Sequence, residues 1–272
     1  MKFIPFGSLP RSGSTLLMNI LDQNDLFHVS HYSDLARFIS NTKVLVENET
    51  ACQQIDYNTF NECVKNFCKQ GSDGWIKTLC PENKILIDKS RSWLIDIDYF
   101  YKIFEKMKTI ILIRDLRGVV NSFEKIHNNS WTINRNEFNY NFNSDFQKQR
   151  IDYTLNLWFL YQPLVSLKEL IDIKKSYLDN LLIIRYEDLL VNPIYTMEKI
   201  YYFLELPNFE HNFDHIEQFE HNDNPLQPYG CHKIFPKLEK LKTIYQELND
   251  ENLNYIIEKH SWFYEEFYPE VL

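Results

Sequence analysis

The sequence predicts an α/β fold, a three-layer sandwich in which a central parallel sheet is flanked by helices. Short apolar runs typical of fully buried strands recur at residues 3–8, 84–87, 109–113 and 181–185, and a helix-like segment follows each run. This alternation is typical of a parallel sheet that is covered on both faces. In such folds ligands bind beyond the carboxyl ends of the strands.

The helices are predicted from the spacing of apolar residues. After the first strand, Leu16, Leu17, Ile20 and Leu21 recur at the spacing of one buried helix face. The polar, Asn-rich stretch 128–145 has weak periodicity and is expected to be a loop. Helices are expected at residues 14–24, 35–46, 60–68, from near Leu116, at 146–174 with a kink or break at Pro163, and at 236–260.

Length and composition indicate an ordinary globular chain. With 272 residues, 44% of them hydrophobic, the chain is long enough to bury a large core, and we expect one domain over residues 1–272. The formal charge of −9 disfavours a general nucleic-acid binder, which normally carries a basic excess. A polyanionic ligand therefore requires a local basic pocket.

Cysteine usage and the chain start bear on compartment and metal binding. The 5 Cys residues form no C-x-x-C pair and no cluster at zinc-site spacing, so we expect reduced thiols and no metal. No run approaches the roughly 18–20 apolar residues of a membrane span, and the first residues lack the pattern of a signal peptide. These observations predict a cytoplasmic protein without a membrane partner.

The most informative stretch is residues 7–17, where a strand turns through small polar residues directly into a helix. Backbone N–H groups, the helix dipole and hydroxyls converge there on one point, which is how an anion site is built. The stretch is P-loop-like, but Ser14 stands where a kinase P-loop has its lysine, and the basic residue is Arg11 inside the loop. The alternative is an ordinary Ser-capped helix after a turn.

Residues 10–17 resemble the 5′-phosphosulfate-binding loop of sulfotransferases that use 3′-phosphoadenosine 5′-phosphosulfate, in the form found in tyrosylprotein sulfotransferases and related bacterial enzymes. The resemblance continues in the family's order through residues 88–91, 110–123 and 183–193, and spans about two-thirds of the chain. It implies that the cofactor's 5′-phosphosulfate is bound by Arg11, Ser12, Gly13, Ser14 and Thr15.

The resemblance also implies a second anion site. Arg114, just past an apolar strand, and Ser122 on the following helix correspond to the family's pair that binds the 3′-phosphate, which ATP lacks. The alternative is an Arg114 that pairs with the adjacent Asp115 and a Ser122 that faces solvent. Arg117 either caps the same phosphate or projects elsewhere.

Two further residues are candidates for cofactor contacts. Tyr186 corresponds to a tyrosine near the nucleotide, although a strand-end tyrosine that closes the core is an equal alternative. Lys233 lies in the loop 222–236, where the family has a late loop that closes over the cofactor, so we expect a phosphate contact or a solvated lysine.

Arg11 and Lys89 are the predicted catalytic cations, because the matching Arg and Lys of tyrosylprotein sulfotransferases contact the transferring group. The alternative for Lys89 is an ion pair with Asp88 or with another nearby carboxylate. The general base is expected near residues 28–34, which contain no Glu; His31 has the most suitable ordinary pKa and Asp34 is the second candidate.

The sequence therefore predicts metal-free, in-line transfer of a sulfuryl group to a hydroxyl acceptor, leaving adenosine 3′,5′-bisphosphate. The alternatives are a P-loop small-molecule kinase and a catalytically inactive nucleotide-binding relative. The acceptor, a small molecule or a peptide, and the oligomeric state stay open. Aromatic segments around Tyr140 and at residues 262–264 either line an acceptor pocket or belong to the core.

Overall fold

The computed structural model describes residues 3–30, 33–47, 56–129, 147–173, 178–218, 234–239 and 245–272. Its centre is a sheet with the order β2-β3-β1-β4-β5, in which every neighbouring pair is parallel. The sheet confirms the predicted fold class. Its strands are β1 (Phe3–Ser8), β2 (Phe27–Ser30), β3 (Ile85–Lys89), β4 (Thr109–Ile113) and β5 (Leu181–Arg185).

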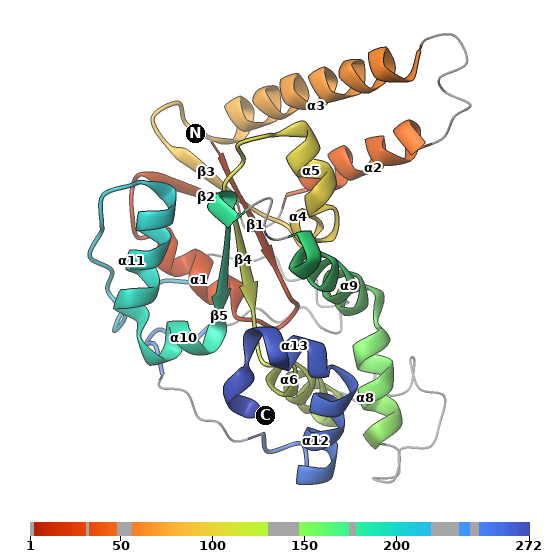
Figure 1. Cartoon of the computed structure of the whole chain (residues 1–272). Coiled ribbons are helices and arrows are strands. Elements are labelled where there is room, and N and C mark those ends of the chain that lie inside the picture. Colours follow the sequence, from red (N-terminus) through yellow and green to blue (C-terminus); the bar gives the residue numbers. More distant parts are fainter. Residues whose placement is uncertain are drawn as a thin grey trace.

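Helices surround this sheet (Figure 1). In chain order they are α1 (Ser14–Leu21), α2 (Leu35–Glu47), α3 (Tyr57–Leu79), α4 (Ser92–Ile95), α5 (Ile97–Ile103), α6 (Leu116–Asn129), α8 (Gln147–Asn156), α9 (Trp158–Ile173), α10 (Tyr186–Val191), α11 (Pro193–Leu204), α12 (Asp250–Lys259) and α13 (Ser261–Phe267). Short 3-10 turns lie at η4 (Leu178–Asn180) and η5 (Pro269–Val271).

The sheet separates two apolar layers, as β4 illustrates. Ile110 and Leu112 pack with α1 and α11, whereas Ile111 and Ile113 pack with α4, α6 and α9. Successive side chains of a strand point to opposite faces, so a continuous apolar strand fits only between two covered faces. Figure 1 shows α1, α10 and α11 on one side of the sheet and α4, α5 and α9 on the other.

Several element predictions were wrong in extent. The strand predicted at 84–87 is β3, which continues to Lys89. The helix predicted at 60–68 is α3, which runs on through Gly71 and Gly74 because Cys68, Ser72 and Ile76 are buried on one face. That packing outweighs the cost of about 1 kcal/mol for each helical glycine.

The long helix predicted at 146–174 is interrupted at Leu157, between α8 and α9, and not at Pro163. The ring of a helical proline crowds the carbonyl four residues earlier, so the disturbance lies on its N-terminal side. Of the helix predicted at 236–260, the described residues are helical only in α12, since residues 236–239 and 245–249 are not helical.

Strand β2 was not predicted. It has only four residues, and its half-buried His28 and Ser30 break the apolar pattern. The short helices α10 and α11 after β5 were also missed as separate elements.

No helix in the described part of the chain is long and apolar enough to cross a membrane. Cys63, Cys68 and Cys80 are free thiols. The single-domain organisation over residues 1–272 stays a prediction.

Candidate functional site

The turn between β1 and α1 leaves the N-terminus of α1 without a side-chain cap. Gly13 is the N-cap residue, and the first turn of α1 carries no acidic residue. By contrast, Asn192 and Asn249 cap α11 and α12 with their own side chains. The first N–H groups of a helix need an acceptor, and where no side chain supplies one, an anion fits.

Two residues of this turn adopt left-handed backbone conformations, Arg11 with φ 57° and Gly13 with φ 82°. Gly13 is also required by a close approach, because a Cβ placed there would lie 2.4 Å from the ring of Tyr186. The buried Ser12 hydroxyl donates to the Leu9 carbonyl at 2.7 Å. The Ser12 hydroxyl is therefore used inside the turn and helps to fix its shape.

Lys89, the last residue of β3, reaches the start of α1. Its Nζ donates to Thr15 Oγ1 at 3.3 Å. The carboxylate of the preceding Asp88 is fully buried and accepts from Trp93 Nε1 at 2.7 Å. Burial raises the pKa of Asp88 to about 6, against the opposing hydrogen bonds of Ser33 and Trp93.

Arg114 and Ser122, from the end of β4 and from α6, face the same turn. Arg11 Nε donates to Ser122 Oγ at 3.0 Å, and Arg114 Nη1 donates to the Arg11 carbonyl at 2.8 Å. The Arg114 guanidinium lies over the Tyr186 ring, 4.7 Å from its centroid. Gly118 permits this position, because a Cβ there would lie 2.8 Å from Arg114 Nε.

These contacts bring residues from four separate sequence blocks together at the carboxyl ends of neighbouring strands. A sequence model of the sulfotransferase family matches residues 4–211, most of the chain and all four blocks. The chain belongs to the sulfotransferase family. None of the curated protein sequences compared with it matches significantly.

Solved sulfotransferases share this fold. A sulfotransferase domain from the curacin biosynthetic pathway is 17% identical, and the match covers 95% of this chain and 96% of that one with a TM-score of 0.54. A sulfotransferase from Mycobacterium avium is 11% identical, over 98% of this chain and 77% of that one, with a TM-score of 0.55. At these identities the likeness concerns the fold alone.

Two sequence-predicted residues of this sulfotransferase, His31 and Lys233, lie outside the described residues. Strand β2, which precedes His31, ends at Ser30 on the carboxyl edge of the sheet. Asp34, the second candidate base, accepts from Arg37 Nη2 at 3.0 Å on an exposed face. No group of His, Cys, Asp and Glu in the described residues is arranged to hold a metal ion.

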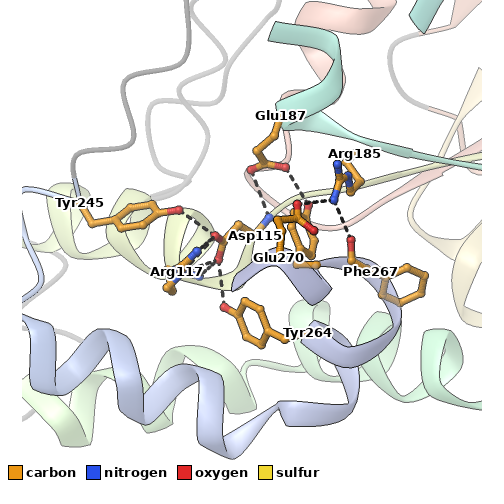
Figure 2. A network of polar contacts seen from close by, with 9 residues as sticks. Asp115, Arg117, Arg185, Glu187, Tyr245, Tyr264, Phe267 and Glu270 are labelled. Atoms are coloured by element: carbon orange, nitrogen blue, oxygen red, sulfur yellow. Dashed lines mark hydrogen bonds and ion pairs between the residues drawn. The ribbon is translucent and has the colours of Figure 1, made fainter. Parts of the chain in front are cut away.

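Sequence reasoning missed a cluster behind Arg114, which we call the Asp115 cluster: Asp115, Arg117, Tyr245 and Tyr264 (Figure 2). Asp115 is buried and accepts from Arg117 Nε at 3.0 Å, from Tyr245 Oη at 2.8 Å and from Tyr264 Oη at 2.9 Å. Arg117 is therefore directed at Asp115, which answers the question left open by the sequence.

A second carboxylate, Glu187, joins the ends of β4 and β5 beside this cluster. Its Oε1 accepts from the Asp115 backbone N–H at 3.3 Å, and its Oε2 accepts from Tyr268 Oη at 2.7 Å. Burial raises the pKa of Glu187. Arg185 adds contacts to the Phe267 carbonyl and to Glu270, so the C-terminal residues are fixed to both strand ends (Figure 2).

One sequence feature, Gly118, is related to the position of the Arg114 side chain. Gly118 stands inside an otherwise regular helix, where glycine costs about 1 kcal/mol relative to alanine. In this chain Gly118 does mark a close approach, that of Arg114, whereas a Cβ at Gly71 or Gly74 of α3 would meet nothing within 4 Å. Tyr264 offers no such signal, because its partner Asp115 is 149 residues away in the sequence.

Proposed function

We propose that this sulfotransferase transfers a sulfuryl group from 3′-phosphoadenosine 5′-phosphosulfate to a hydroxyl oxygen, leaving adenosine 3′,5′-bisphosphate. One observation carries the proposal: three cations from distant blocks meet at one turn. Lys89 contacts Thr15, Arg11 contacts Ser122, and Arg114 contacts the Arg11 carbonyl.

The residues of the turn suit a donor that carries two separate anionic groups. The uncapped start of α1, the Thr15 hydroxyl and Lys89 fit the 5′-phosphosulfate, and Arg114 and Ser122 fit the 3′-phosphate. A chain of net charge −9 can bind a donor of about four negative charges because these cations lie at the site itself. Acidic surface residues farther than about 8 Å away are screened by salt and repel the donor little.

When bound, the donor supplies the sulfuryl group, and the chain supplies charge and position. Lys89, Arg11 and the hydroxyls of Ser14 and Thr15 are proposed to neutralise the oxygens on which charge develops. The nucleotide is proposed to be held in position by Arg114, Ser122 and Tyr186. Lys233 is proposed to add a phosphate contact. None of these roles requires a metal ion.

The acceptor is proposed to be a hydroxyl of a small molecule or a peptide, with His31 as the general base and Asp34 as the second candidate. The cytoplasmic location, the lack of nucleic-acid and membrane partners and the single domain also stay predictions. Membership of the sulfotransferase family favours this function over a small-molecule kinase.

Calorimetry with adenosine 3′,5′-bisphosphate tests the donor site, and transfer of labelled sulfate from the donor to a panel of phenols, alcohols, sugars and tyrosine peptides tests the reaction. We expect binding well below about 100 μM, the weak limit for a built site. No heat at that concentration would refute the donor site. Binding without transfer to any acceptor would favour an inactive relative.

Lys89→Ala tests the catalytic assignment. Removing one preorganised cation should slow sulfate transfer at least about tenfold, while bisphosphate binding changes less. Lys77→Ala, on the exposed face of α3, is the matched control and should leave the rate unchanged. An unaltered rate in Lys89→Ala would remove Lys89 from the mechanism.

A further inference from the structure

Asp115 directly follows Arg114, and an aspartate beside an arginine at a strand end is a natural ion-pair partner. Within the described residues, Arg114 makes no ion pair with Asp115. The carboxylate is occupied instead by Arg117 Nε and by the hydroxyls of Tyr245 and Tyr264. Figure 2 shows these side chains converging on Asp115.

The Arg114 guanidinium points to the other side, toward the turn. It donates to the Arg11 carbonyl at 2.8 Å and lies over the Tyr186 ring. Neither a neutral carbonyl nor a ring face is a counter-charge for the guanidinium. The nearby Glu187 carboxylate does interact electrostatically with Arg114. It is hydrogen-bonded elsewhere, to Tyr268 Oη and to the Asp115 backbone N–H, so the guanidinium stays available to an anion. A carboxylate with vacant acceptor sites close by would compete with that anion.

The hydroxyls of Tyr245 and Tyr264 are suited to remain hydrogen-bonded to the Asp115 carboxylate. Tyr264 is fully buried and Tyr245 is half-buried, and a buried hydroxyl needs an acceptor. Burial, together with the negative charge of Asp115, raises the pKa of both phenols, so both hydroxyls keep their protons and donate. Both come from the C-terminal part of the chain, 130 and 149 residues after Asp115.

We propose that the Asp115 cluster sets the nucleotide selectivity of the site: Arg117, Tyr245 and Tyr264 hold the Asp115 carboxylate away from Arg114, which leaves Arg114 available for a 3′-phosphate. Tyr245 and Tyr264 are then positioning residues that act through Asp115. The inference rests on the proposed function, and it adds a source of selectivity that lies outside the nucleotide-contacting residues.

The test compares adenosine 3′,5′-bisphosphate with adenosine 5′-monophosphate, which lacks the 3′-phosphate. In the double variant Tyr245→Phe/Tyr264→Phe, Asp115 loses two donors and should attract Arg114. We expect the bisphosphate to bind at least about fivefold more weakly and the monophosphate to change less than about twofold by calorimetry. The matched control is Tyr255→Phe, which removes a tyrosine hydroxyl from Asp152 on α8 and should leave both affinities unchanged.

Adding Asp115→Asn to the double variant separates charge competition from a loss of structure. Without the carboxylate, Arg114 has no competing partner, so bisphosphate affinity should return to within about threefold of the wild type. A merely structural role would give no rescue. If the double variant does not fold, Tyr245→Phe alone, at the half-buried position, should reduce the ratio of the two affinities about twofold.

Two outcomes would overturn the inference. The first is an unchanged ratio of the two affinities in folded variants, whether neither nucleotide or both nucleotides equally lose affinity. The second is a failure of Asp115→Asn to restore binding of the bisphosphate. A wild-type protein that binds neither nucleotide would instead refute the proposed function, and the inference with it.

Discussion

The two halves of the candidate site are built by different means. On the β1 and β3 side, the turn takes its shape from backbone conformation, with Arg11 and Gly13 left-handed and the start of α1 uncapped. On the β4 and β5 side, Arg114 and Tyr186 are backed by the carboxylates Asp115 and Glu187, which C-terminal tyrosines occupy. The shape of the turn in the first half is set by residues close in sequence, whereas the second half is assembled from distant segments.

Two buried aspartates at the strand ends, Asp88 and Asp115, differ in the donors that their carboxylates receive. Asp88 at the end of β3 receives neutral donors, Trp93 and Ser33, and burial raises its pKa to about 6. Asp115 just after β4 receives the charged Arg117 as well as two hydroxyls. The first half should therefore respond most to backbone changes and to pH, and the second to changes of charge.

The largest expected effect comes from Gly13→Ala. The new Cβ would lie 2.4 Å from the Tyr186 ring, at a φ of 82° that alanine avoids, so the turn must change shape. Because the 5′ site is part of that turn, both adenosine nucleotides should bind at least about 100-fold more weakly by calorimetry.

Gly71→Ala is the matched control for this change. It lies in α3, where a Cβ meets nothing within 4 Å, so binding should not change and helix propensity should raise the unfolding free energy by up to about 1 kcal/mol. Retained binding in Gly13→Ala would show that the turn tolerates another shape.

The second effect concerns Asp88 and pH. Its folded-state pKa lies above the ordinary value of 3.8, so the folded protein holds a proton that the unfolded chain releases between pH 4 and 6. The resulting stabilisation is present below about pH 4 and is lost as the pH rises through about 6.

Asp88→Asn should remove this dependence. Relative to the variant, the wild type should lose about 2 kcal/mol of unfolding free energy between pH 4 and pH 7, measured by urea denaturation. Asp73→Asn, on the exposed face of α3, should follow the wild type. Parallel pH curves for Asp88→Asn and the wild type would contradict the assignment.

The same division explains how much could be predicted from the sequence. The four predicted strands and the anion-binding turn depend on short-range patterns, such as the apolar run 109–113 and the small residues from Gly7 to Ser14. Strand β2 has too few residues for a pattern. Pro163 predicts a disturbance of the helix on its N-terminal side, but it does not fix the residue at which the helix stops.

The Asp115 cluster could not be predicted for another reason. A tyrosine gives no sign of the acceptor that its hydroxyl will reach, and Tyr245 and Tyr264 find theirs more than a hundred residues earlier in the chain. Arg114 was identified from its sequence block, but the alternative of a pair with Asp115 could be settled only by the fold.

The smallest and most selective effect is expected from Gly118→Ala in α6. Alanine is favoured in a helix by about 1 kcal/mol, so the unfolding free energy should not fall. The new Cβ would, however, lie 2.8 Å from Arg114 Nε and must displace that flexible side chain. The bisphosphate should therefore bind about tenfold more weakly, while the monophosphate should bind as before.

Gly74→Ala, an exposed helical position with free space around it, gives the gain in helix propensity without the displacement. Equal weakening of both nucleotides in Gly118→Ala would mean that α6 also shapes the 5′ site. Unchanged bisphosphate binding would mean that the end of β4, rather than α6, fixes Arg114. A loss of affinity confined to the bisphosphate would show that the two halves of the site act independently. Gly13 belongs to the turn that both nucleotides use, whereas Gly118 acts only on Arg114, the residue proposed to bind the 3′-phosphate.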